Sequence, residues 1–238
     1  MQQKKFGEEL TGWTPPRTPD AAVMEGRYVR LERLAWTHAD PLYRANSADD
    51  AIWDYLPYGP FHSEVPFIRW VQDMAGQSDP FFYALRDKAS GQVGGVMSYL
   101  RITPAAGSIE LGHINLSPQL QRTRAATEAM MLMIGWAFEA GYRRFEWKCD
   151  ALNLPSRRAA QRLGLSYEGI FRQATVVKGR NRDTAWFAAI DKEWPGLKAA
   201  YDAWLAPSNF DAEGCQIERL GDLTRLVRVS ADPALGAD

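Results

Sequence analysis

A short basic turn, residues 119–124, stands between a strand pattern and a helix pattern. The stretch NLSPQLQRTRAATEAMMLM, residues 115–133, begins with the alternation of a half-buried strand and ends with apolar residues at helical spacing. Backbone N–H groups at the start of a helix, with the positive end of its macrodipole, favour a bound anion such as a phosphate. Such turns usually carry glycine, which permits positive φ and close approach, but Arg124 stands in that place here. The pattern predicts either a phosphate site, to which arginine could add charge-assisted hydrogen bonds, or a strand–helix connection with a basic surface.

A second polar pair, Asn153 and Ser156, follows the strand pattern 144–149. Asparagine is a preferred N-cap residue, so Asn153 could cap a helix over residues 155–163, which Gly164 would end. Ser156 would then lie in the first turn of that helix. It could be a second cap residue or a hydroxyl with a chemical role.

Strand and helix patterns must position these two motifs. Strands are predicted at 27–34, 81–87, 92–102, 108–117, 144–149, 167–177 and 184–194, and helices at 37–46, 64–75, 126–140 and 155–163. The strands that flank helix 126–140 imply a parallel, right-handed crossover, whereas the earlier strands are expected to be antiparallel neighbours. The order therefore predicts an α/β fold with a mixed, mostly antiparallel sheet and helices on both faces.

The composition is that of a globular protein without a marked charge excess. The chain has 238 residues and a formal charge of −1, which does not favour nucleic-acid binding. Two cysteines are too few for a secreted disulfide scaffold, so a reducing compartment, the cytoplasm, is expected. Three scattered histidines and the lack of an HExxH pattern predict no metal site. No run of about 18 apolar residues occurs, so no membrane span is predicted.

Three segments are expected along the chain. Residues 1–26 include three prolines in GWTPPRTPD and predict an extended arm on the domain. Residues 27–205 form the main domain, and residues 206–238 a C-terminal extension of open role. The extension could be a strand or helix that packs on the domain, or a dimer element, so both a monomer and a homodimer are possible.

At these two motifs the sequence resembles a known family. The element order, QRTRAATEA and N-x-x-S-R-R-A-A-Q-R-L-G-L-S-Y-E-G are similar to the GNAT superfamily of N-acetyltransferases over roughly residues 27–195. The branch that it most resembles includes the ribosomal-protein-alanine acetyltransferases. The first family motif reads Gln/Arg-x-x-Gly-x-Gly/Ala. Here Gln121 and Ala126 match it, and Arg124 replaces the middle glycine.

The resemblance implies the GNAT fold, with acetyl-CoA as cosubstrate. The backbone of the first motif would hold the pyrophosphate, and Asn153 would reach the pantetheine arm. The residues implied in cosubstrate binding are Leu116, Gln121, Arg122, Thr123, Arg124, Ala125, Ala126, Asn153 and Ser156.

The same resemblance suggests the groups that move protons. Aminolysis of a thioester needs a neutral amine and an acceptor for its proton. Glu110, on strand 108–117, occupies the place where the family often carries its base, although a solvent-facing strand charge would give the same pattern. Ser156 would protonate the departing thiolate. His113, three residues after Glu110, is expected on the opposite face of the sheet, and Glu168 is a further candidate base.

The acceptor region is predicted from an aromatic, Pro/Gly-rich loop, residues 53–61. In the family this region roofs the acceptor pocket, so Trp53, Tyr55 and Tyr58 could line it, and the turn 178–183 could form the other wall. Each could equally be a core or turn residue. We expect direct acetyl transfer to a primary amine, on a small molecule or a protein N-terminus, because neither cysteine stands in a nucleophile context. The alternative is a non-catalytic acyl-CoA-binding regulator on the same fold.

Overall fold

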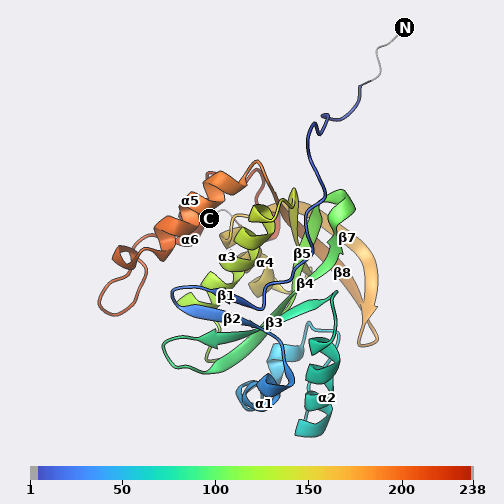
Figure 1. Ribbon diagram of the computed structural model, residues 1–238, viewed down its shortest axis with the longest axis vertical. Coiled ribbons are helices and arrows are strands. Elements are labelled where there is room, and N and C mark those ends of the chain that lie inside the picture. The colour runs from blue at the N-terminus through green and yellow to red at the C-terminus, as the bar shows by residue number, and fades with distance from the viewer. Residues whose placement is uncertain (1–4, 237–238) are drawn as a thin grey trace.

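Eight strands form one mixed sheet in a computed structural model that describes residues 5–236 (Figure 1). The strands are β1 (Val23–Glu25), β2 (Val29–Arg33), β3 (Phe81–Asp87), β4 (Val93–Thr103), β5 (Ser108–Leu116), β6 (Arg144–Asp150), β7 (Ser166–Val177) and β8 (Arg180–Ile190). Their order in the sheet is β1-β2-β3-β4-β5-β6-β8-β7. Only β5 and β6 are parallel, as the predicted crossover requires, and the other neighbours are antiparallel.

Helices cover both faces of this sheet. They are α1 (Ala39–Asn46), α2 (Glu64–Ala75), α3 (Arg124–Glu139), α4 (Leu154–Arg162), α5 (Trp194–Leu205) and α6 (Leu220–Thr224), with short 3-10 turns between some elements. Figure 1 shows α1 and α2 below the sheet, and α3, α5 and α6 above it. The predicted mixed α/β fold is confirmed. None of the helices within residues 5–236 is long and apolar enough to cross a membrane.

Alternating side chains divide the buried residues into two clusters, one on each face. On β3, Tyr83 packs in the cluster that includes α3, whereas Phe82 packs in the cluster that includes α1 and α2. Ile109 and Leu111 of β5 belong to the α3 cluster. Because successive strand side chains point to opposite faces, Glu110 lies on the α1–α2 face.

The parallel pairing of β5 with β6 stops partway along the two strands. The last register pair is Leu111 with Trp147, although β5 continues to Leu116 and β6 to Asp150. The two backbones therefore separate towards their carboxyl ends. The starts of α3 and α4 follow these ends, so the opening in the sheet lies between the two motifs.

One element differs in type from its prediction. The strand expected over 184–194 ends at Ile190, and a helix, α5, begins at Trp194. Leu197, Tyr201 and Trp204 are buried at helical spacing against the α3 cluster. Their spacing of three to four residues indicates a helix in the sequence, but no helix was predicted after the strand.

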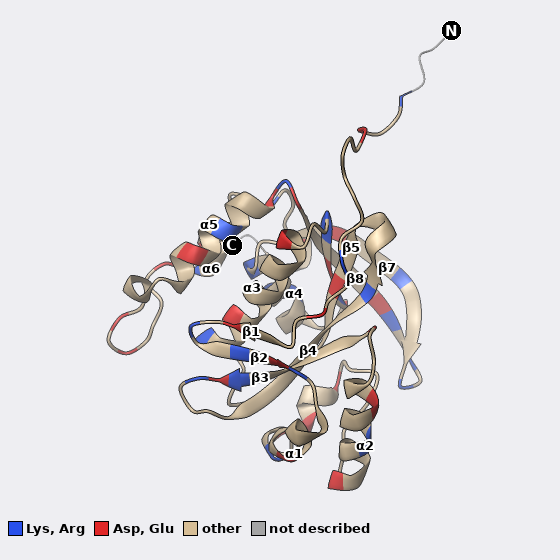
Figure 2. Cartoon of the chain, viewed as in Figure 1, with Lys and Arg blue, Asp and Glu red and all other residues tan. Residues whose placement is uncertain are grey.

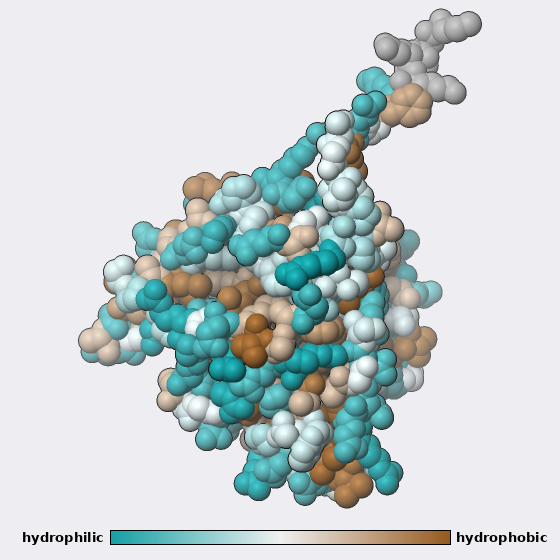
Figure 3. All heavy atoms as spheres, viewed as in Figure 1, coloured by the Kyte–Doolittle hydropathy of each residue, from teal (hydrophilic) through white to brown (hydrophobic). Residues whose placement is uncertain are grey.

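Both extensions of the chain pack on the domain. In the N-terminal arm, the carbonyl of Ala21 accepts a hydrogen bond from the Tyr83 hydroxyl at 2.8 Å, and the carbonyl of Arg17 accepts one from Tyr142 at 3.1 Å. In the C-terminal extension, α6 contacts α4 and α5, and Thr224 Oγ1 donates to the Arg162 carbonyl at 3.0 Å. Figure 3 shows that the first described residues of the arm project from the body, whose surface on this side is mostly hydrophilic with small hydrophobic patches.

Candidate active site

The basic turn is a helix start with open backbone donors. Helix α3 begins at Arg124, two residues before its predicted start, because Thr123 is the N-cap and its Oγ1 accepts from Ala126 N at 3.1 Å. The N–H groups of Arg124 and Ala125 have no hydrogen-bond partner within residues 5–236, as expected for the first turn of a helix. The left-handed residue of the turn is Arg122, with φ of 61°. Position 124 is helical and does not require glycine.

A basic groove of about 930 Å³ leads to this helix start. The cationic residues that line it are Arg27, Lys88, Arg122, Arg124, Arg162 and Arg219. Only Asp87 and Glu213 oppose them among the lining residues, so the groove favours an anion. Its volume suits a ligand of nucleotide size. The geometry therefore fits the phosphates of a coenzyme.

Arg124 does not point freely into the groove. Its guanidinium lies over two rings, at 4.8 Å from the Tyr28 centroid and 4.5 Å from that of Phe210. Tyr28 follows β1, and Phe210 belongs to the C-terminal extension. The arginine thus links this extension to the mouth of the groove, a role that was not predicted.

The second motif has the predicted capping geometry. Asn153 Oδ1 accepts from the backbone N–H of Ser156 at 3.1 Å, so Asn153 is the N-cap of α4. The Ser156 hydroxyl oxygen accepts from Trp147 Nε1 at 3.0 Å, which leaves the hydroxyl hydrogen able to donate elsewhere. Cys149 lies beside the serine, and burial raises the pKa of its thiol to about 11. A thiol held in its protonated form is a poor nucleophile.

Glu110 is buried between two cations. Its side chain is 3% exposed, with Oε1 at 2.7 Å from Arg101 Nη1 and Oε2 at 2.8 Å from Lys148 Nζ. Lys148 Nζ also lies 2.7 Å from the carboxylate of Glu146, two residues earlier on β6. A solvent-facing Glu110, the alternative interpretation of the sequence, is therefore excluded. These two contacts fix the carboxylate beside the opening between β5 and β6.

The predicted position of His113 is wrong. A bulge between β4 and β5 shifts the register there, and His113 takes a positive φ of 50°. The imidazole consequently lies on the same face as Glu110, where Nδ1 is 3.0 Å from the Tyr58 hydroxyl and the ring is 5.2 Å from Phe82. Burial, with the positive charges of Arg101 and Arg182, lowers the pKa of His113 to about 4. The imidazole is neutral at neutral pH.

The aromatic loop closes over this face. Tyr55, 41% exposed, donates from its hydroxyl to the Leu152 carbonyl at 3.3 Å, beyond the end of β6. Lys178, in the turn after β7, donates to the Trp53 carbonyl at 2.8 Å. Trp53 itself is only 2% exposed and packs in the core beneath Tyr58, so it supports the roof and presents no face to a ligand.

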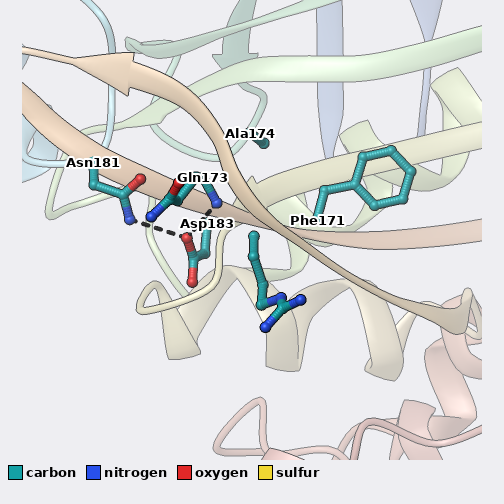
Figure 4. A pocket seen from close by; sticks show the side chains of 6 residues that line it. Phe171, Gln173, Ala174, Asn181 and Asp183 are labelled. Carbon is teal, nitrogen blue, oxygen red and sulfur yellow. Dashed lines mark hydrogen bonds between the residues drawn. The ribbon is translucent and has the colours of Figure 1, made fainter.

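The β7–β8 hairpin reaches the aromatic loop through Lys178. Figure 2 shows acidic and basic residues following one another along these two strands. A cavity of about 760 Å³ lies where β7 bulges, and Figure 4 shows Asn181 and Gln173 turned towards Asp183 while Phe171 points away. Asp183 Oδ1 accepts from Gln173 N at 2.7 Å and from Asn181 Nδ2 at 3.0 Å. These two hydrogen bonds engage the Asp183 carboxylate and stabilise the bulge of β7.

Glu168, the further candidate base, lies away from the reaction region. Its carboxylate forms a bidentate pair with the Arg144 guanidinium, with Oε1 2.8 Å from Nη1. Arg144 starts β6, at the paired end of β5 and β6, whereas the opening lies at the other end. The side chain is therefore not brought together with Glu110, His113 and Ser156.

One buried carboxylate that supports the site was missed. Glu128, in the second turn of α3, is 3% exposed and accepts three backbone hydrogen bonds from the β1–β2 turn, including Tyr28 N at 2.6 Å and Val29 N at 2.9 Å. It fixes that turn, and with it Tyr28, against the start of α3. The available signal was an acidic residue within the apolar run AATEAMM.

Known proteins are similar to this chain in sequence and in architecture. Residues 29–166 match the acetyltransferase (GNAT) domain family. The chain is 48% identical to a GCN5-related N-acetyltransferase from Brucella melitensis, whose crystal structure superposes with a TM-score of 0.89 over 91% of this chain and 100% of that chain. It is also 24% identical over 149 residues to the uncharacterized N-acetyltransferase YnaD of Bacillus subtilis (strain 168), covering 62% of this chain and 85% of that protein.

A more distant structure shares the fold. The microcin C7 self-immunity acetyltransferase MccE, solved in complex with acetyl-CoA and AMP, is 19% identical, with a TM-score of 0.63 over 69% of this chain and 93% of that chain. The family match spans more than half of the chain and includes the open helix start and the capped α4. The chain therefore belongs to the GNAT family of acetyl-CoA-dependent N-acetyltransferases.

Proposed function

We propose that the protein transfers the acetyl group of acetyl-CoA to a primary amine by direct attack in a ternary complex. The observation that carries this proposal is the separation of β5 from β6 between two different environments. On one side lie the open donors of α3 and the basic groove, and on the other lie Glu110, His113 and the aromatic roof. An opening through a sheet with an anion site on one side suits a coenzyme and a separate acceptor.

The residues at the helix start would hold the coenzyme. The N–H groups of Arg124 and Ala125 offer donors to the pyrophosphate, and Arg122 adds charge. Leu116, at the end of β5, and Asn153, before α4, flank the opening through which a pantetheine arm would pass. Gln121 Nε2 donates to the Leu116 carbonyl at 3.0 Å and so stabilises the turn.

Acetyl-CoA supplies a thioester carbonyl that an amine can attack. Ser156 is proposed to protonate the leaving thiolate, since Trp147 occupies one lone pair of its oxygen and orients the hydroxyl. Glu110 is proposed to receive the amine proton through water, because its carboxylate is buried and held beside the opening. His113 is a second candidate for this role, since its imidazole is neutral and lies on the same face.

Two acceptor classes follow from this arrangement. The roof over the opening, with Tyr55 and Tyr58, would take a small amine or the first residues of a protein chain. The latter acceptor would correspond to the ribosomal-protein-alanine acetyltransferase branch. We propose a cytoplasmic location, since both cysteines are free thiols, which suits a reducing compartment.

Calorimetry with acetyl-CoA, combined with a thiol-release assay over a panel of amines and peptides, tests this function. Binding followed by amine-dependent release of CoA is expected. Binding without release across the panel would favour an acyl-CoA-binding regulator instead.

The same calorimetry tests the groove. Arg122→Ala should weaken acetyl-CoA binding by about 1–3 kcal/mol, because it removes a charge-assisted contact. The loss should be smaller for pantetheine, which lacks the pyrophosphate. Equal affinities of the parent and the variant for acetyl-CoA would show that Arg122 does not contribute to binding.

A further inference from the structure

Arg182 is a cation without a partner on the acceptor side. No hydrogen bond or ion pair to its guanidinium occurs within residues 5–236, and its Nε atom is buried and unsatisfied. The side chain is half-buried. A buried donor atom without a partner is costly, and a native structure that retains one usually matches it with a ligand or solvent.

The strand pattern places Arg182 on the face where the acceptor would bind. Ala185 and Phe187 of β8 belong to the α3 cluster, so Arg182 and Trp186 point to the opposite face. This is also the face of Glu110. Thr184 pairs with Asp150 at the carboxyl end of β6, so Arg182, two residues before Thr184 on β8, lies beyond the end of the strand where β5 and β6 separate.

Four carboxylates of this region have other partners. Glu110 is held by Arg101 and Lys148, and Asp183, the next residue along β8, faces the other way and holds the β7 bulge. Asp79 accepts from the backbone N–H groups of Arg101 and Ile102, both at 2.9 Å. Asp150 Oδ1 accepts from Leu152 N at 2.9 Å. None of them neutralises Arg182.

A second unsatisfied donor lies on the same face. Trp186 Nε1 is buried without a hydrogen-bond partner among residues 5–236, while its ring packs between the Lys148 ammonium at 3.9 Å and the Phe171 ring at 4.5 Å. The Arg182 guanidinium donates hydrogen bonds and carries a positive charge, so the group that would match it is an anionic acceptor. A carboxylate supplies two acceptor oxygens and the negative charge that a guanidinium binds in a bidentate manner.

We propose that the acceptor is a small amino carboxylate, an amino acid or a close analogue, whose carboxylate binds Arg182 while its amine faces the opening. This inference rests on the proposed acetyl transfer and names its substrate class. Arg182 would be a binding and orienting residue. A polyamine fits poorly, because it would bring further positive charge next to an unpaired guanidinium.

Matched pairs of acceptors test the proposal. The twenty amino acids are compared with their α-carboxamides and with spermidine, both in thiol release and in titrations of the CoA-bound protein. The parent should prefer the carboxylates in kcat/KM, although the carboxamides carry the less basic and more readily deprotonated amine. Arg182→Gln should reduce kcat/KM for the carboxylates roughly 10- to 100-fold, with the carboxamides and the KM for acetyl-CoA nearly unchanged. Arg69→Gln, at an exposed arginine of α2, should match the parent.

Several results would overturn the inference. The first is a kcat/KM for the carboxamides or spermidine that equals or exceeds that for the carboxylates. The second is an equal loss of kcat/KM for both members of each pair in Arg182→Gln. The third is acetylation of peptides alone. The titrations keep the test separate from the proposed function. If no amine releases thiol, the acetyl-transfer proposal fails, and carboxylate-dependent binding that Arg182→Gln abolishes still supports the site. Binding of carboxylate and carboxamide with equal affinity refutes it.

Discussion

Glu110 combines a proposed chemical role with a structural one. Its two oxygens lie within 2.8 Å of two different cations, and its burial beside the opening orients the carboxylate. An ionised carboxylate in this place can take a proton from an amine through water. The same carboxylate also balances the charge of the buried Lys148 ammonium. Substitution of Glu110 therefore removes both a proposed base and an ion-pair partner, and the two effects must be separated.

Glu110→Gln should lower kcat by about 10²–10⁴-fold if the carboxylate is the general base, with little change in acetyl-CoA affinity. Ser156→Ala should lower kcat less, because water can replace a hydroxyl. Steady-state kinetics measures both effects.

The matched control is Glu146→Gln, since Glu146 pairs with the same Lys148 Nζ at 2.7 Å but lies on the adjacent strand. It should retain kcat within about threefold, well below the general-base range. If Glu110→Gln also stays within that limit, it is not the base, and His113 becomes the residue to test.

At the scale of elements, the two sides of the opening are held by neighbouring segments. The aromatic loop before α2 is joined to the β6–α4 connection through Tyr55 and to the β7–β8 turn through Lys178. Helix α4 is joined to the C-terminal extension through Arg157 and Asp232. The acceptor roof and the cosubstrate side therefore depend on different contacts.

Tyr55→Ala should raise the KM for the acceptor by roughly 5- to 30-fold, the loss expected for one aromatic contact of about 1–2 kcal/mol. Acetyl-CoA affinity should stay near that of the parent, because Tyr55 lies on the opposite side of the opening. Tyr55→Phe keeps the ring and loses only the hydrogen bond to Leu152, so its KM should change little. Loss of cosubstrate binding, or unfolding, in Tyr55→Ala would show that the loop is core and the roof assignment incorrect.

Asp232→Asn should lower the free energy of unfolding by roughly 3–5 kcal/mol, because it leaves the buried Arg157 guanidinium without its anion. The pair is 5% and 0% exposed, with both Arg157–Asp232 hydrogen bonds at 2.6 Å. Urea unfolding measures the change. Asp222→Asn, at an exposed acid in the same extension, should unfold like the parent. Equal midpoints for both variants would show that this ion pair does not anchor the extension.

At the scale of the whole molecule, the burial of His113 makes the stability of the fold depend on pH in the acid range. His113 has a pKa of about 4 in the folded chain, against 6.5 for the free side chain, chiefly because it is buried. The unfolded chain therefore binds more protons than the folded one between these values. By linkage, stability falls as the pH drops through about 6.5 to 4, and the full effect of this group is about 3 kcal/mol.

The expected outcome is a steeper loss of stability on acidification in the parent than in His113→Gln, which cannot titrate. Urea unfolding at steps from pH 7 to pH 4.5 measures it. The groups around His113 are Tyr58, Asp79, Arg101 and Arg182, and all remain in the variant. Parallel curves for the two proteins would contradict the assignment of the pH dependence to His113.

Local patterns in the sequence determined most of the elements and both motifs. The alternating strands, the parallel crossover and the cap formed by Asn153 were predicted, because each depends on residues near one another along the chain. The helix beginning at Trp194 was also locally encoded, although the strand pattern before it obscured the change of period.

Tertiary structure alone decided what faces the opening. The bulge that turns His113 towards Glu110 depends on the register with β4, which no local pattern shows. The contacts of Arg124 with Tyr28 and Phe210 bring together segments distant in sequence. That Arg182 has no partner within residues 5–236 likewise depends on how the carboxylates of this region are engaged. Side-chain chemistry and spacing specify which groups are available, but their pairing is set by which strands and loops become neighbours on folding.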